Sequence, residues 1–280
     1  MSRKLPMSDF RARRVVLTRR DFGYAPKPEP RPSDLIDEAT WKSIVTLPDD
    51  VAVRTSNHHG STLRQMDDLW GAWVRCCGGT EDCFHPAKLD AGDDFESAIY
   101  TALTGFYRLS ISALRSALEL TTIATWAQTS GKLKAYRAWR DGKSTISFGQ
   151  ACDGLIASTA DLQKRLREDV NDTLFDRKTS AGEGGFARRI YDGISDFAHA
   201  RPGHTDADMR ESNGPIYVRS AFNHVAWIYF ETMGLGFVML LLARPRTALP
   251  GTVIELFRDV SRVKSCLLYT SPSPRDRQKS

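Results

Sequence analysis

The sequence predicts an all-α protein, a helical bundle of about five main helices with a flexible basic N-terminal segment. The first observation is the stretch Asp93–Gln128, which contains no proline and repeats apolar residues at steps of three to five. Later segments show similar spacing and are too long to be strands. A chain of 280 residues with 41 % hydrophobic content can also bury one substantial core.

The stretch Asp93–Gln128 is expected to be one central helix that packs on more than one side. Arg108, Ser112, Arg115 and Glu119 share one face of it. This polar stripe is either a solvated face or a set of partly buried charges paired with a second helix, because buried charge persists only when it is paired. Small residues around the stripe would allow a neighbouring helix to approach closely.

Further helices are expected before and after the central one. A turn at Leu47-Pro48 closes the first of them, and a loop rich in glycine and acidic residues leads into the central helix. The last helix is expected to begin with a capping box formed by Thr252 and Glu255. The expected helical ranges are 34–45, 61–75, 132–140, 148–174, 186–199 and 216–243, and the expected loop is 75–94.

The helix 186–199 carries a second polar face. Asp192, Asp196 and His199 stand at i, i+4 and i+7, so they could meet the stripe of the central helix across an interface. Alternatively, His199 lies near a helix C-terminus only because the helix dipole favours a cation there.

One cluster in the loop has the residue types of a zinc site, namely Cys76, Cys77, Cys83 and His85, with His58 and His59 upstream. Structural zinc sites use cysteines two to four residues apart, so that both sulfurs reach one ion. Here one pair is adjacent and the next cysteine is six residues away. We therefore expect an unligated loop, with zinc as the alternative, and no cofactor.

The formal charge of +5 comes from the ends of the chain. Residues 1–31 carry +6 and the last fifteen residues +2, which leaves −3 for the body, so the folded part is mildly acidic. Few cysteines and no signal peptide favour the cytoplasm. The apolar run Val225–Ala243 is expected to be a bundle helix, with a single-pass anchor as the alternative.

The C-terminal stretch Cys266–Asp276, CLLYTSPSPRD, resembles the translation of a transposon-type sequencing-library adapter. This resemblance implies that residues 266–280 are a non-native tail and that the natural chain, from a prokaryote, continues beyond Ser265. The expected organisation is therefore a basic segment 1–34, one helical domain 35–265, and the tail.

Three short patterns carry a family resemblance: Phe106-Tyr107-Arg108, Arg115-x-x-Leu-Glu119 and Ile194-Ser-x-x-x-His199. Over residues 40–245 the chain resembles uncharacterised bacterial all-helical proteins, and more distantly HEPN-type bundles, many of which are RNases. The HEPN signature is an Arg followed four to six residues later by a His. Arg219 with His224 satisfies it, as does Arg54 with His59, but Ser220 follows Arg219 where active members carry Asn, Asp or His.

Besides a peripheral membrane protein that would use the basic N-terminus and the helix Val225–Ala243, two functional hypotheses follow for a protein whose motifs give no metal, nucleotide or serine-hydrolase signature. The first is a non-catalytic interaction or sensing module. The second is a metal-independent RNase of a toxin or antiphage system, in which Arg219 stabilises the phosphate and His224 transfers a proton. Arg115, Glu119 and His199 are the alternative catalytic set. A homodimer and RNA are the partners considered, and no membrane is expected.

Overall fold

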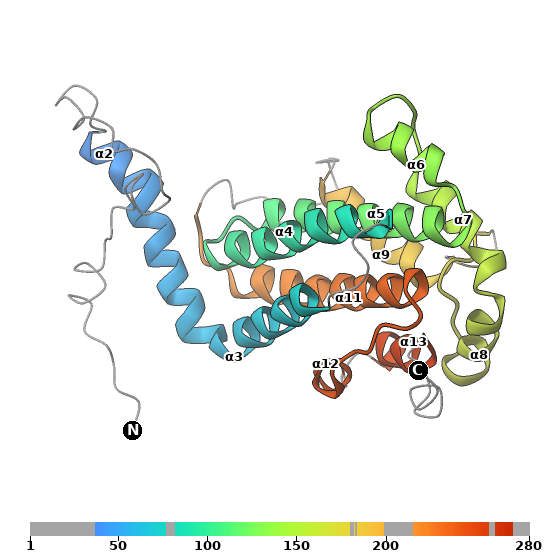
Figure 1. Ribbon diagram of the computed structural model, residues 1–280. Helices are drawn as coiled ribbons and strands as arrows, with labels where there is room; N and C mark the ends of the chain where they lie inside the picture. Colours follow the sequence, from blue (N-terminus) through green and yellow to red (C-terminus); the bar gives the residue numbers. More distant parts are fainter. Residues whose placement is uncertain are drawn as a thin grey trace. The chain divides into compact units, whose positions relative to one another are not determined.

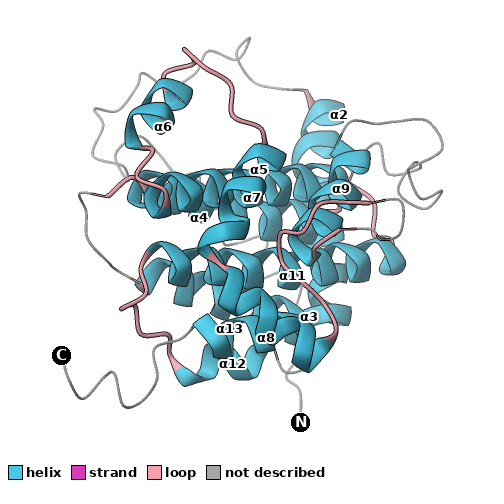
Figure 2. Cartoon of the chain, turned by 90° about the vertical axis from the view of Figure 1, so that its right-hand side faces the viewer, coloured by secondary structure: helices cyan, strands magenta, loops and turns pink. Residues whose placement is uncertain are grey.

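The computed structural model describes residues 37–76, 82–179, 182, 184–198, 215–257 and 261–270. Apart from one isolated bridge between Thr179 and Gly182, the regular elements in this part of the chain are helices (Figure 2). The predicted all-α class is confirmed. The expected number of about five main helices is too low, because several of the predicted helices are divided into two.

The chain forms two compact units, Met1–Val45 and Thr46–Ser280. In the first, α2 (Glu38–Trp41) begins at Asp37, whose carboxylate accepts a hydrogen bond of 2.9 Å from the Thr40 amide. The π-helix η2 (Lys42–Thr46) follows. The predicted segment 1–34 lies outside the described residues.

The predicted turn at Leu47-Pro48 is wrong, because α3 (Leu47–Arg75) begins there and has Pro48 in its first turn. Proline is tolerated at that position, where a backbone N–H has no helical partner. The helix bends at His59, whose backbone angles of φ −130° and ψ 22° are not helical. Gly60 and Ser61 follow, and such pairs are a common cause of sharp kinks.

The predicted central helix is two helices, α4 (Phe84–Leu103) and α5 (Tyr107–Thr129), which lie side by side (Figure 1). Between them Gly105 has φ +84°, and a side chain there would place its Cβ only 2.5 Å from the Ile216 carbonyl oxygen. The apolar spacing continues across this turn, so the sequence pattern hides it. The predicted loop 75–94 is also partly wrong, because α4 starts at Phe84.

Helix α11 (Arg219–Ala243) runs along the α4–α5 pair and confirms the predicted helix 216–243 (Figure 1). Trp73 of α3 packs into the core between these helices. Its ring makes edge-to-face contacts with Phe95 and Phe237, with ring centroids 5.4 and 5.5 Å apart. By length and composition α11 could also cross a membrane, but 83 % of its most apolar window is buried inside the structure.

The predicted helix 148–174 is divided into α7 (Phe148–Ser158) and α8 (Ala160–Val170), with Thr159 between them. Asn171, at φ +51°, ends α8 in the left-handed conformation that asparagine tolerates. Helix α6 (Leu133–Arg140) precedes this pair. Helix α9 (Phe186–Ala198) follows it and confirms the predicted helix at 186–199 within the described residues.

Two short helices close the described chain, α12 (Gly251–Leu256) and α13 (Ser261–Thr270). The predicted capping box is wrong, because α12 begins at Gly251 after Pro250 and has no side-chain cap. Helix α13 packs on α11 and includes residues 266–270 of the predicted non-native tail, with Cys266 and Leu267 buried. Residues 271–280 lie outside the described part.

Candidate functional site

The guanidinium of Arg115 lies at the contact between α5 and α9. Its Nη2 donates to the hydroxyl of Tyr191 at 2.6 Å, and its Nε donates to Ser195 Oγ at 3.2 Å. Nη1 forms an ion pair with Glu119 at 3.2 Å. All three nitrogens of the guanidinium therefore have protein partners.

This polar centre is half-buried, since the side chains of Arg115 and Glu119 are each 25 % exposed. The ring of Tyr191 stacks on Phe148 with centroids 3.9 Å apart, and burial raises the pKa of Tyr191 to about 12. The phenol therefore remains protonated over the physiological pH range. Of the two interpretations of the stripe, pairing holds for Arg115 and Glu119, whereas Arg108 is exposed.

The partners that α9 provides differ from those predicted. Tyr191 and Ser195 contact Arg115, whereas Asp192 is exposed. His199 lies outside the described residues. Tyr191 and Ser195 stand at i and i+4, so their shared helix face was visible in the sequence, but nothing in it indicated which face meets α5.

The structure does not bring Arg219 and His224 together. Five residues place them about 140° apart around a helix. The centroid of the His224 ring is 5.5 Å from that of Phe197 and 6.0 Å from that of Trp227. Arg219, in contrast, is exposed at the start of α11. A joint action of this pair on one phosphate has no geometric support.

Arg219 instead follows closely after Tyr217, the residue that contacts His59 at the kink of α3. His59 Nε2 is 3.1 Å from the Tyr217 hydroxyl, and its ring stacks on Phe222 at 4.3 Å. The ring of His58 stacks on Tyr217 at 5.4 Å. Burial, followed by the positive charges of Arg219 and His58, lowers the pKa of His59. In the sequence, His58 and His59 stood out only beside the cysteine cluster, and His59 also in the signature that it forms with Arg54. Nothing in the sequence pointed to Tyr217.

The zinc alternative has no support among the described residues, where no three His, Cys, Asp or Glu side chains are placed to hold an ion. Cys77 lies outside them. Cys83 donates to Gln128 Oε1 at 3.2 Å, and burial raises the pKa of its thiol to about 11. Next to it, Asp82 accepts two hydrogen bonds from Arg244, at 2.6 and 2.7 Å.

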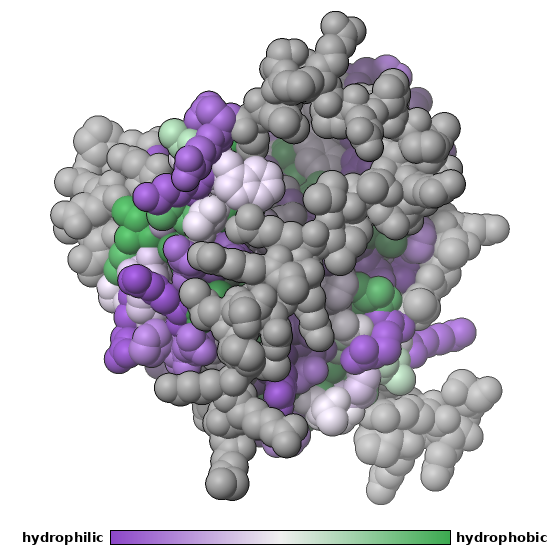
Figure 3. All heavy atoms as spheres, turned by 90° about the vertical axis from the view of Figure 1, so that its left-hand side faces the viewer, coloured by the Kyte–Doolittle hydropathy of each residue, from purple (hydrophilic) through white to green (hydrophobic). Residues whose placement is uncertain are grey.

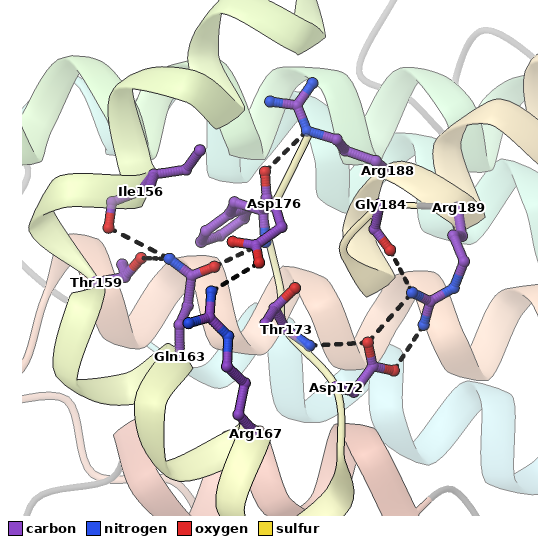
Figure 4. A network of polar contacts seen from close by, with 11 residues as sticks. Ile156, Thr159, Gln163, Arg167, Asp172, Thr173, Asp176, Gly184, Arg188 and Arg189 are labelled. Atoms are coloured by element: carbon purple, nitrogen blue, oxygen red, sulfur yellow. Dashed lines mark hydrogen bonds and ion pairs between the residues drawn. The ribbon is translucent and has the colours of Figure 1, made fainter. Parts of the chain in front are cut away.

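A second polar network holds the connection from α8 to α9 (Figure 4). Asp172 accepts from Arg189 Nη2 at 2.6 Å, and Gln163 donates to the Ile156 carbonyl at 3.2 Å. Arg188 donates to the Phe175 carbonyl at 2.8 Å. These bonds satisfy backbone groups and pair charges within the loop, so the network has a structural role.

Two further features were not anticipated. Glu231 of α11 is 5 % exposed, and its Oε2 has no hydrogen-bond partner in the described structure. A cavity of about 400 Å³ is lined by residues of α7, α8, α11 and α13. Because Tyr269 and Thr270 of the predicted tail line this cavity, we assign it no function.

Comparisons with protein-family models, with curated proteins and with solved structures found no match for this chain. The candidate site is therefore interpreted from its own geometry.

Proposed function

We propose that this chain is a non-catalytic interaction or sensing module of the prokaryotic cytoplasm. The observation that carries the proposal is that each of the three guanidinium nitrogens of Arg115 has a protein partner, in Tyr191, Ser195 and Glu119. A catalytic arginine must leave donors for the phosphate that it stabilises. Arg115 uses Nε and Nη2 in the α5–α9 contact and Nη1 in the ion pair with Glu119, so it serves as a structural tie between two helices.

The surface of the bundle also fits an interaction module. Large apolar side chains are exposed at Tyr100, 66 %, and Leu109, 58 %, near the ends of α4 and α5. On the face in Figure 3 small hydrophobic areas lie between hydrophilic ones. Such mixed surfaces suit transient contacts, including a homodimer.

The test is an RNA-degradation assay of the full chain in EDTA, with His224→Ala and Arg115→Ala beside the wild type. The expected result is no cleavage above background by any of the three. Cleavage by the wild type that disappears in a variant with native circular dichroism would overturn the non-catalytic function and locate the active residue.

A metal-independent HEPN-type RNase of a toxin or antiphage system remains the second candidate. One observation favours it, namely that Arg219 has a histidine neighbour, His59, although not the one in its own motif. If the protein cuts RNA, His59→Gln should abolish cleavage and His224→Ala should not. The reverse result would restore the pair read from the sequence motif.

A further inference from the structure

A basic cluster lies where the kink of α3 meets the start of α11. We call it the His59 site and define it by His58, His59, Tyr217 and Arg219. The two histidines come from the bend of α3, and the other two residues come from the chain entering α11. The proposed non-catalytic function does not use these four side chains, and the RNase alternative uses only Arg219 and His59.

The site is held in place by contacts on both sides. The Tyr217 hydroxyl is 3.1 Å from His59 Nε2, while the Tyr217 ring stacks on His58 with an interplanar angle of 18°. One residue later, the Val218 amide donates to the Tyr107 hydroxyl at 3.0 Å. The hydroxyl and the imidazoles are therefore positioned before any ligand arrives, which reduces the entropy lost on binding.

Arg219 gives the site a fixed positive charge. The groups that lower the pKa of His59 electrostatically are Arg219 and His58, and no carboxylate among the described residues is a cause of this shift. Helix α11 begins at Val218 without a side-chain cap, has no acidic residue in its first turn, and carries Arg219 there instead. A cation at this end opposes the helix dipole, whereas an anion is favoured.

The arginine is also available. It is exposed, and no carboxylate of the described residues forms an ion pair with it, in contrast to Arg115, Arg188, Arg189 and Arg244. An arginine fork suits two oxygens of a phosphate, and a tyrosine hydroxyl or a protonated imidazole suits the third.

We infer that the His59 site binds a phosphomonoester, with Arg219 and Tyr217 on the phosphate, the buried His59 behind the Tyr217 hydroxyl, and the exposed His58 at its edge. This inference rests on the proposed non-catalytic function, because it treats the ester as a ligand and not as a substrate. The phosphomonoester is either a free nucleotide or the 5′-phosphate end of a nucleic acid, since both present the same group.

The test is calorimetric titration of the full chain with inorganic phosphate, with AMP, and with a short oligonucleotide carrying either a 5′-phosphate or a 5′-hydroxyl. We expect phosphate and AMP to bind, and Arg219→Gln to weaken both by about tenfold or more. Arg108→Gln is the matched control, because Arg108 is an exposed arginine in the first turn of α5. Affinity should increase below neutral pH, because a bound anion favours protonated His59.

The outcomes separate the two proposals. Absence of phosphate and AMP binding at millimolar concentration, or equal weakening by Arg108→Gln, overturns the phosphate site and leaves the non-catalytic function intact. Binding accompanied by release of product from AMP or the oligonucleotide keeps the site and overturns the non-catalytic function. Preference for the 5′-phosphorylated oligonucleotide over AMP identifies a nucleic-acid end as the source, and the opposite preference identifies a free nucleotide.

Discussion

Replacing Glu231 by glutamine should make the stability of this protein less sensitive to pH. The carboxylate is buried in α11, and its burial raises its pKa from 4.5 to about 7. The charge of Arg262 and a hydrogen bond from Trp227 oppose this shift only in part. Arg262 itself is engaged by Asp172 at 3.0 Å.

The sign follows from the two protonation states. The unfolded chain loses the Glu231 proton near pH 4.5, whereas the folded chain loses it at about pH 7. Between these pH values the folded state therefore binds more protons than the unfolded state. Stability therefore falls as pH rises through this window. The difference between the two pKa values lowers the free energy of unfolding by about 3 kcal/mol at pH values well above 7. At about pH 5.5 Glu231 lowers the free energy of unfolding by only about 1.4 kcal/mol. The destabilisation by Glu231 is therefore roughly 2 kcal/mol larger at about pH 8.5 than at about pH 5.5.

The assay is urea denaturation followed by circular dichroism at these two pH values. The advantage of Glu231→Gln over the wild type should grow by about 2 kcal/mol between them, whatever the new amide costs by itself. Glu255→Gln, at an exposed carboxylate of α12, serves as the control and should show no such growth. If the wild type and Glu231→Gln lose stability in parallel as pH rises, Glu231 is not a buried acid with a raised pKa, and the reasoning fails.

Three further predictions concern the packing, and each is tested by urea denaturation. Arg115→Met should cost about 2 kcal/mol, because it removes the half-buried tie between α5 and α9, while Arg108→Met at the exposed position should change stability by less than about 0.5 kcal/mol. Equal effects would mean that the tie contributes nothing. Gly154→Ala should cost about 1 to 2 kcal/mol, since its Cβ would lie 2.1 Å from Trp126 Nε1. Gly193→Ala, in open space within α9, should stabilise by up to about 1 kcal/mol, and a loss there would contradict the described helix.

The parts of the fold that the sequence predicted well are local. Helix α9 has strong apolar periodicity and α11 is a long apolar run, and breakers near their ends place their bounds within a few residues. Helical periodicity depends on neighbours three and four positions away, so it can be read without knowledge of the fold. The all-α class follows from the same property repeated along the chain.

The turn between α4 and α5 was decided by tertiary contact. Gly105 is needed there because the backbone of Ile216, far away in sequence, passes where a side chain would stand. The local pattern around Gly105 continues a helix, and a single glycine costs a helix only about 1 kcal/mol. Periodicity alone therefore merged two helices into one.

The sequence alone placed Arg115 and Glu119 on one helix face, because spacing fixes which side chains share a face. Only the tertiary structure selected Tyr191 and Ser195 as the partners of Arg115, and only the tertiary structure brought Arg219 to His59 instead of His224. The physical reason is the same in both cases. Periodicity defines the faces of each helix, whereas the pairing of faces depends on how the complete set of helices packs.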